Sequence, residues 1–87
     1  MIRVLVADDQ DLVRTGLCIS LETEPDIEVV GEAANGLEAV ALAAKLTPDV
    51  ICMDVEMPEM NGIDASRQIL AGAASGETRP APAILVL

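Results

Sequence analysis

The 87-residue sequence contains no histidine and no aromatic residue. Without histidine, the chain cannot use imidazole for acid–base catalysis or form a phosphohistidine of its own. Without phenylalanine, tyrosine or tryptophan, it lacks the rings on which nucleic-acid bases stack. Any chemistry on this chain must therefore be carried by its carboxylates.

Basic residues and long apolar runs are also scarce. Five Lys and Arg stand against fifteen Asp and Glu, and the formal net charge of −10 disfavours contact with nucleic acid or an anionic membrane surface. Although 52% of the residues are hydrophobic, no stretch approaches the roughly 20 apolar residues that span a bilayer. The apolar start, 2–7, runs into Asp8 and Asp9 without a cleavage site for a secretory signal. We therefore expect a cytoplasmic globular domain with no membrane partner.

The two cysteines, Cys18 and Cys52, lie far apart in the sequence, each among apolar residues. They form no CxxC motif, and there is no histidine to complete a metal site. We expect buried, reduced thiols rather than a disulfide or metal ligands.

Hydrophobic periodicity predicts strands alternating with helices. The expected strands lie at 2–7, about 28–33, 50–53 and 83–87. The first two expected helices lie at 11–22 and from Leu37 to about Thr47. The third should begin at a cap, Asn61, and end in the small-residue tract 71–76. A loop is expected at 77–82. No repeat and no second domain is visible.

This order of elements predicts right-handed crossovers and a parallel sheet covered on both faces, an α/β fold. Ligands bind such sheets beyond the carboxyl ends of the strands. Asp8 and Asp9 follow the first strand, and Asp54 follows the third. If these strands are neighbours, three carboxylates meet in one crevice.

Three adjacent carboxylates repel one another, and a divalent cation would remove the conflict. Mg²⁺ suits such a site because it prefers hard oxygen ligands and retains water molecules or phosphate oxygens as further ligands. Asp54 could then attack phosphorus and form an acyl phosphate, while Asp8 and Asp9 hold the metal.

Simpler interpretations of the same residues remain open. Asp8 and Asp9 could only cap the following helix. Asp54 could be an ordinary loop residue, and Asn61 could serve only as a helix cap. Glu56 and Glu59 are expected to be solvated loop charges, since acidic side chains are seldom buried unpaired.

Two longer segments, Arg3 to Gln10 and Met53 to Gly62, closely resemble response-regulator receiver domains. Pro25 to Ala33 and Asn35 to Ala39 are similar to the NarL/FixJ subfamily, whose members usually carry a C-terminal LuxR-type helix-turn-helix domain. The resemblance implies a flavodoxin-like (CheY-like) doubly wound parallel sheet, with strand order 2-1-3-4 and three helices in this chain.

The resemblance also implies roles for individual residues. Asp54 would be the phosphoacceptor and a Mg²⁺ ligand, Asp9 would bind Mg²⁺ directly, Asp8 would act through water, and Glu56 would contribute its backbone carbonyl. The phosphoryl donor would be a sensor histidine kinase or a small molecule such as acetyl phosphate. The family commonly has aspartate at the position of Asn61.

The family's switch Thr or Ser and its Lys would follow the fourth and fifth strands, beyond Leu87. We therefore interpret 1–87 as an incomplete receiver domain that lacks the last strand, two helices and an output domain through which DNA would be contacted. An exposed edge at 83–87 would favour a homodimer or a strand-exchanged oligomer.

The principal hypothesis is a signalling switch, not an enzyme, that controls an output in transcription. A binding-only remnant that no longer switches is one alternative. A Mg²⁺-dependent phosphohydrolase is another, but such enzymes need an aspartate two positions after the nucleophile, where this chain has Glu56.

Overall fold

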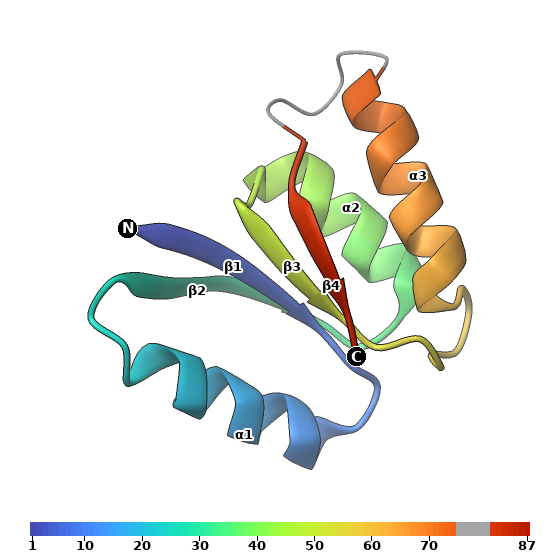
Figure 1. Cartoon of the computed structure of the whole chain (residues 1–87). Helices are drawn as coiled ribbons and strands as arrows, with labels where there is room; N and C mark the ends of the chain where they lie inside the picture. Colours follow the sequence, from blue (N-terminus) through green and yellow to red (C-terminus); the bar gives the residue numbers. More distant parts are fainter. Residues whose placement is uncertain (75–80) are drawn as a thin grey trace.

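The computed structural model describes residues 1–74 and 81–87. In this part of the chain, strands alternate with helices from the first residues to the last (Figure 1). The strands are β1 (Ile2–Ala7), β2 (Ile27–Ala33), β3 (Val50–Met53) and β4 (Ala83–Val86). The helices are α1 (Asp11–Glu22), α2 (Gly36–Leu46) and α3 (Gly62–Ala74).

The strands form one sheet in the order β2-β1-β3-β4, and the three neighbouring pairs are parallel. The predicted fold class and strand order are therefore confirmed. The carboxyl ends of β1 and β3 lie side by side, because Ala7 is the register partner of Met53. Whatever follows these two strands must meet at one edge of the sheet.

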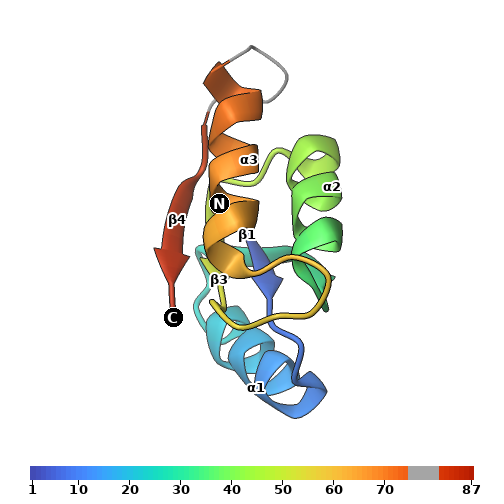
Figure 2. The same ribbon diagram turned by 90° about the vertical axis from the view of Figure 1, so that its right-hand side faces the viewer.

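The two faces of the sheet are covered unequally. Helices α2 and α3 pack on one face, and α1 packs on the other (Figures 1 and 2). Side chains alternate along a strand, so β1 sends Leu5 to the α2/α3 face and Val4 and Val6 to the α1 face. The larger core cluster lies under α2 and α3 and includes Leu5, Ile51, Met53, Ala39, Ala43, Ala65 and Ile69.

The two thiols are free and lie in the smaller core cluster, on the α1 face. Burial raises the pKa of both Cys18 and Cys52, and the nearby Glu32 and Glu22 raise the pKa of Cys18 further. Both thiols therefore stay protonated at neutral pH, and the prediction of buried, reduced cysteines is confirmed.

The end of the third helix lies within the predicted tract. The tract 71–76 was expected to end this helix, and α3 extends four residues into the tract, to Ala74. Alanine is the strongest helix former, and three of the four residues at 71–74 are alanine, so the single Gly72 does not interrupt the helix. Residues 75–80, including most of the expected loop at 77–82, lie outside the described residues.

Strand β4 forms one edge of the sheet and pairs with β3. Its side chains are mostly exposed, with Leu85 56% and Val86 47% accessible, and Leu87 beyond it 61% accessible. The oligomerisation expected from such an edge stays a prediction. Within the described residues, none of the helices combines the length and apolar character needed to cross a bilayer.

Candidate functional site

Two strand ends bring the three aspartates together. Asp54 follows β3 and donates its backbone N–H to the Ala7 carbonyl at 2.9 Å, while Asp8 follows β1 and donates its backbone N–H to the Ala33 carbonyl at 3.0 Å. The sheet pairing thus extends into both loops. Carboxylate oxygens of Asp8, Asp9 and Asp54 all lie within 4.8 Å of one another. The expectation that the two strands are neighbours is confirmed, and it creates the acidic crevice.

The three carboxylates differ in burial. Asp8 is buried, with 6% of its surface accessible, Asp54 is half-buried and Asp9 is exposed. Burial is the largest cause of a raised pKa at Asp54, and the charges of Asp8 and Asp9 raise that pKa further. The backbone N–H groups of Val55 and Glu56 hydrogen-bond to the Asp54 carboxylate and act in the opposite direction. The ionised Asp54 therefore lies where a positive charge would stabilise it.

The simplest alternative for Asp8 and Asp9, capping of α1, is wrong. The N-cap residue is Gln10, and no side-chain hydrogen bond caps the helix. The Asp8 carboxylate instead accepts the Gln10 backbone N–H at 2.9 Å, which fixes the turn that follows β1. Capping therefore does not explain why two aspartates stand at this position.

The loop from Asp54 to Asn61 is held against the crevice by Gly62. Gly62 donates its N–H to the Val55 carbonyl at 2.8 Å. A Cβ atom at this glycine would lie 2.0 Å from the Asp54 carbonyl oxygen, so only glycine allows this approach. Gly62 is part of the segment Met53 to Gly62 that resembles the family, but no local sequence signal predicts its approach to the Asp54 carbonyl, which depends on tertiary structure.

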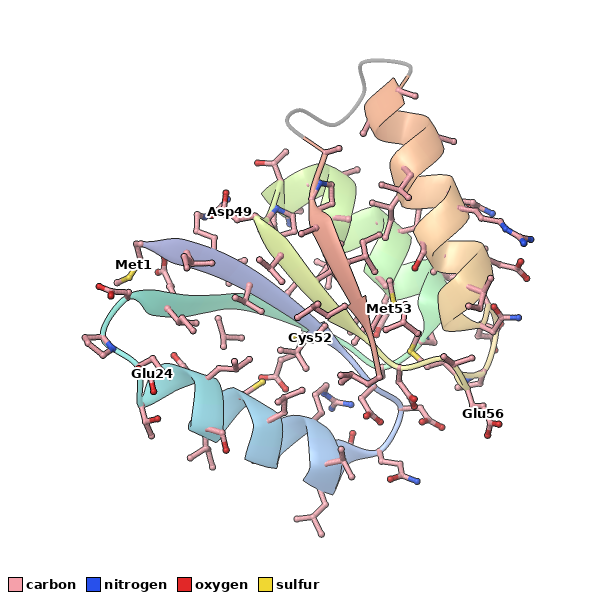
Figure 3. The ribbon with its side chains drawn as sticks, in the orientation of Figure 1. Met1, Glu24, Asp49, Cys52, Met53 and Glu56 are labelled. Carbon is pink, nitrogen blue, oxygen red and sulfur yellow. The ribbon has the colours of Figure 1, made fainter. Side chains whose placement is uncertain are left out.

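The capping role of Asn61 is confirmed. Its side-chain oxygen accepts the Asp64 backbone N–H at 2.9 Å in the first turn of α3. Glu56 and Glu59 are both exposed, as expected for solvated loop charges. Figure 3 shows the labelled Glu56 side chain directed away from the strands. Glu56 is nevertheless one of the residues that line the crevice.

The crevice has the donor set that a hard divalent cation requires. The three aspartates supply anionic oxygens, and among the described residues that line the crevice none is basic. Residues 55–58 and Asn61 of the β3–α3 loop, together with Gln10, Ile63 and Leu87, form its walls. The residues present therefore fit a metal ion of the Mg²⁺ type, which prefers carboxylate oxygens and completes its shell with water or phosphate.

A parallel sheet in this order, with carboxylates beyond the ends of β1 and β3, defines a doubly wound α/β domain. Domains of this class bind their ligands at the carboxyl edge of the sheet. Residues 4–85 match the family described as response regulator receiver domain. The chain belongs to this family, and it is a receiver domain of phosphorylation-based signalling.

Two curated relatives show how similar the chain is to proteins of known role. The transcriptional regulatory protein LiaR of Bacillus subtilis is 58% identical over 69 residues, which is 79% of this chain and 33% of LiaR. Protein-glutamate methylesterase/protein-glutamine glutaminase 2 of Methanospirillum hungatei is 46% identical over 86 residues, 99% of this chain and 23% of that protein. The chain thus spans a quarter to a third of the length of these relatives.

Solved structures agree on the fold. The response regulator domain of Thermotoga maritima CheB superposes with a TM-score of 0.88 at 42% identity, covering 99% of this chain and 59% of that one. A LuxR-family two-component response regulator from Aurantimonas superposes with a TM-score of 0.80 at 37% identity. The superposition covers 97% of this chain and 56% of that one. The resemblance to receiver domains of the NarL and LuxR type is therefore confirmed.

Proposed function

We propose that this receiver domain accepts a phosphoryl group on Asp54 in a Mg²⁺-dependent reaction. The observation that carries the proposal is the meeting of the Asp54, Asp8 and Asp9 carboxylates within 4.8 Å at the carboxyl edge of the sheet. Asp54 is the member of the three that follows β3 directly and is half-buried, with access to the crevice. It is therefore placed to act as the nucleophile.

In this proposal, Asp9 and Asp54 would bind Mg²⁺ directly, Asp8 would act through water, and Glu56 would offer its backbone carbonyl. When bound, the cation supplies positive charge for the phosphoryl oxygens. An Asp54 carboxylate oxygen attacks phosphorus, an acyl phosphate bond forms, and the bond from phosphorus to the donor's leaving group breaks. The buried Asp8 keeps its turn rigid through Gln10, so the acidic loop does not have to reorganise.

The donor would be a phosphohistidine of a sensor histidine kinase or a small acyl phosphate, and the reaction would take place in the cytoplasm. Relatives named as a transcriptional regulator and as a methylesterase show that receiver domains of this kind occur in proteins with different outputs. The NarL- and LuxR-type relatives favour transcription. Residues 1–87 would then be the receiver part of a longer regulator, with any DNA contact made by another domain.

A phosphohydrolase is the weaker candidate. Such an enzyme needs an aspartate two residues after the nucleophile as its acid–base group. Here that position holds Glu56, an exposed glutamate. We therefore expect a single phosphorylation event on this chain and no turnover of a diffusible phosphomonoester.

Intact-protein mass spectrometry tests the proposal. The chain is incubated with acetyl phosphate, with Mg²⁺ or with EDTA, beside Asp54→Asn and the control Asp64→Asn. Asp64 is an exposed acid in the first turn of α3, outside the crevice. One added phosphoryl mass is expected in the parent and the control only with Mg²⁺, and none in Asp54→Asn. Equal incorporation in Asp54→Asn and the parent would refute the proposal.

A further inference from the structure

Arg14, in the first turn of α1, joins three separate segments through one side chain. Its Nη1 donates to the Asp8 backbone carbonyl at 2.7 Å. Its Nε donates to Glu32 Oε1 at 3.1 Å near the end of β2, and its Nη2 donates to Asp11 Oδ1 at 2.6 Å within α1. Only 15% of the side chain is accessible. The guanidinium is therefore largely buried and held by three hydrogen bonds, unlike a solvated surface charge.

The residue that Arg14 holds is the one that begins the acidic loop. Asp8 is fixed at its N–H by Ala33, at its carboxylate by Gln10 and at its carbonyl by Arg14. The carbonyl of Asp8 belongs to the peptide group that leads into Asp9. Among these three contacts, the one from Arg14 is thus the contact that orients the exposed Asp9.

We infer that Arg14 is a positioning residue that holds the Asp8-Asp9 turn in the conformation that binds the metal ion. This inference rests on the proposed function, because it assumes that the crevice binds Mg²⁺. Partners that orient metal ligands without touching the metal commonly contribute as much to affinity as a weak ligand does. Arg14 does not line the crevice, so it acts through the backbone of Asp8.

A purely electrostatic role for Arg14 predicts the opposite result. A positive charge near the crevice repels Mg²⁺, so its removal alone would tighten metal binding. The charge of Arg14 is, moreover, offset by Asp11 and Glu32, which both pair with it. Weaker Mg²⁺ binding after removal of Arg14 would therefore indicate positioning, and tighter binding would indicate a charge effect.

Arg67 provides a matched control. It also pairs with an aspartate three residues earlier in the first turn of its helix, Asp64, at 3.6 Å. Its side chain is 78% accessible, and it lies on α3, outside the crevice lining. Arg67→Ala removes the same side chain and the same type of i,i+3 pair without touching the acidic loop.

The test is a Mg²⁺ titration followed by amide NMR shifts, since the chain has no aromatic fluorophore. For Arg14→Ala we expect the Mg²⁺ dissociation constant to rise about tenfold or more relative to the parent, the usual effect of losing an outer partner of a metal ligand. Arg67→Ala should leave it unchanged. Phosphoryl incorporation in Arg14→Ala should recover towards the parent rate at saturating Mg²⁺, as expected when binding rather than chemistry is impaired.

Folding is checked by circular dichroism, and Arg14→Lys is measured in parallel. Lysine keeps the charge but lacks the planar fork, so an intermediate loss of Mg²⁺ affinity is expected. Folded Arg14 variants with unchanged or tighter Mg²⁺ binding would overturn the inference, as would a parent chain without saturable Mg²⁺ binding. If the affinities shift as expected but the parent takes up no phosphoryl group, the proposed function fails and the role of Arg14 stands.

Discussion

The two ends of the same sheet differ in whether their charged groups have partners within the chain. At the amino end of β1, the Arg3 backbone N–H donates to Asp49 Oδ2 and the Arg3 guanidinium donates to the Thr47 carbonyl, both at 2.9 Å. At the carboxyl end, three carboxylates meet and no basic residue lines the crevice within the described part of the chain. The chain's own hydrogen bonds satisfy the charged groups at the amino end, whereas the carboxylates at the other end form the cation site of our proposal. The comparison therefore contrasts residues that stabilise the fold with residues that we propose to bind a ligand.

Removal of a carboxylate should distinguish the two ends most strongly. Asp9→Asn should weaken Mg²⁺ binding by more than about tenfold, since loss of a direct ligand costs at least as much as loss of an outer partner. Asp49→Asn, at the opposite end, should leave Mg²⁺ affinity unchanged. Calorimetric Mg²⁺ titration of both variants checks the prediction, and equal effects at the two ends would contradict it.

Two glycines should respond to alanine in opposite directions. Gly62→Ala places a Cβ against the Asp54 carbonyl, and overpacking of this kind should destabilise the fold by roughly 1–3 kcal/mol. Gly16→Ala meets nothing within 4 Å on α1 and should stabilise the fold by roughly 0.5–1 kcal/mol. Urea unfolding followed by circular dichroism gives both free energies. A Gly62→Ala variant as stable as the parent would refute the close approach.

The burial of the Asp54 carboxylate, together with the nearby charges of Asp8 and Asp9, should appear as a pH dependence of stability. The pKa of Asp54 is raised in the folded chain above the ordinary 3.8, so the folded chain holds this proton more tightly than the unfolded chain does. The protonated carboxyl group therefore favours folding fully below pH 3.8, and this stabilisation is lost as the pH rises through the folded-state pKa. In EDTA at pH 7, Asp54→Asn should therefore melt at a higher temperature than the parent, and the difference should vanish towards pH 3.

At the amino end of β1, Asp49→Ala should instead lower stability by about 1 kcal/mol, because it removes the hydrogen bond from the Arg3 backbone N–H.

The smallest effects should come from two residues with left-handed backbone conformations, one at each end. Thr47, with φ of 44°, ends α2 near Arg3, and Glu59, with φ of 69°, lies in the loop beside the crevice. Replacement of either by glycine should stabilise the fold by up to about 1 kcal/mol, since this conformation strains residues that carry a Cβ. Thermal melts check the sign, and a loss of stability in both would contradict it.

The fold was largely predictable because its signals are local. The apolar runs of β1 and β3 and the cap at Asn61 depend on residues adjacent in sequence. The end of α3 was predicted only to within the tract 71–76, because glycine among alanines can either end a helix or be tolerated within it. Sequence also placed Asp8, Asp9 and Asp54 at strand ends, and parallel pairing then required them to meet.

The remaining features of the site depend on tertiary contacts. Sequence alone could not decide whether Asp8 caps α1, because that depends on where its side chain turns. The approach of Gly62 to Asp54 and the contact of Arg14 with Asp8 join residues whose relation appears only after folding. Local patterns therefore identified the carboxylates and not the groups that hold them.

The central claim is that Asp54 carries the phosphoryl group, and chemical trapping tests it most directly. The chain is incubated with Mg²⁺ and acetyl phosphate, reduced with borohydride to convert an aspartyl phosphate to homoserine, and analysed by peptide mass spectrometry. We expect homoserine at position 54 and at no other acidic position, and none when EDTA replaces Mg²⁺. Homoserine at Asp8 or Asp9, or incorporation that leaves Asp54 unmodified, would contradict it.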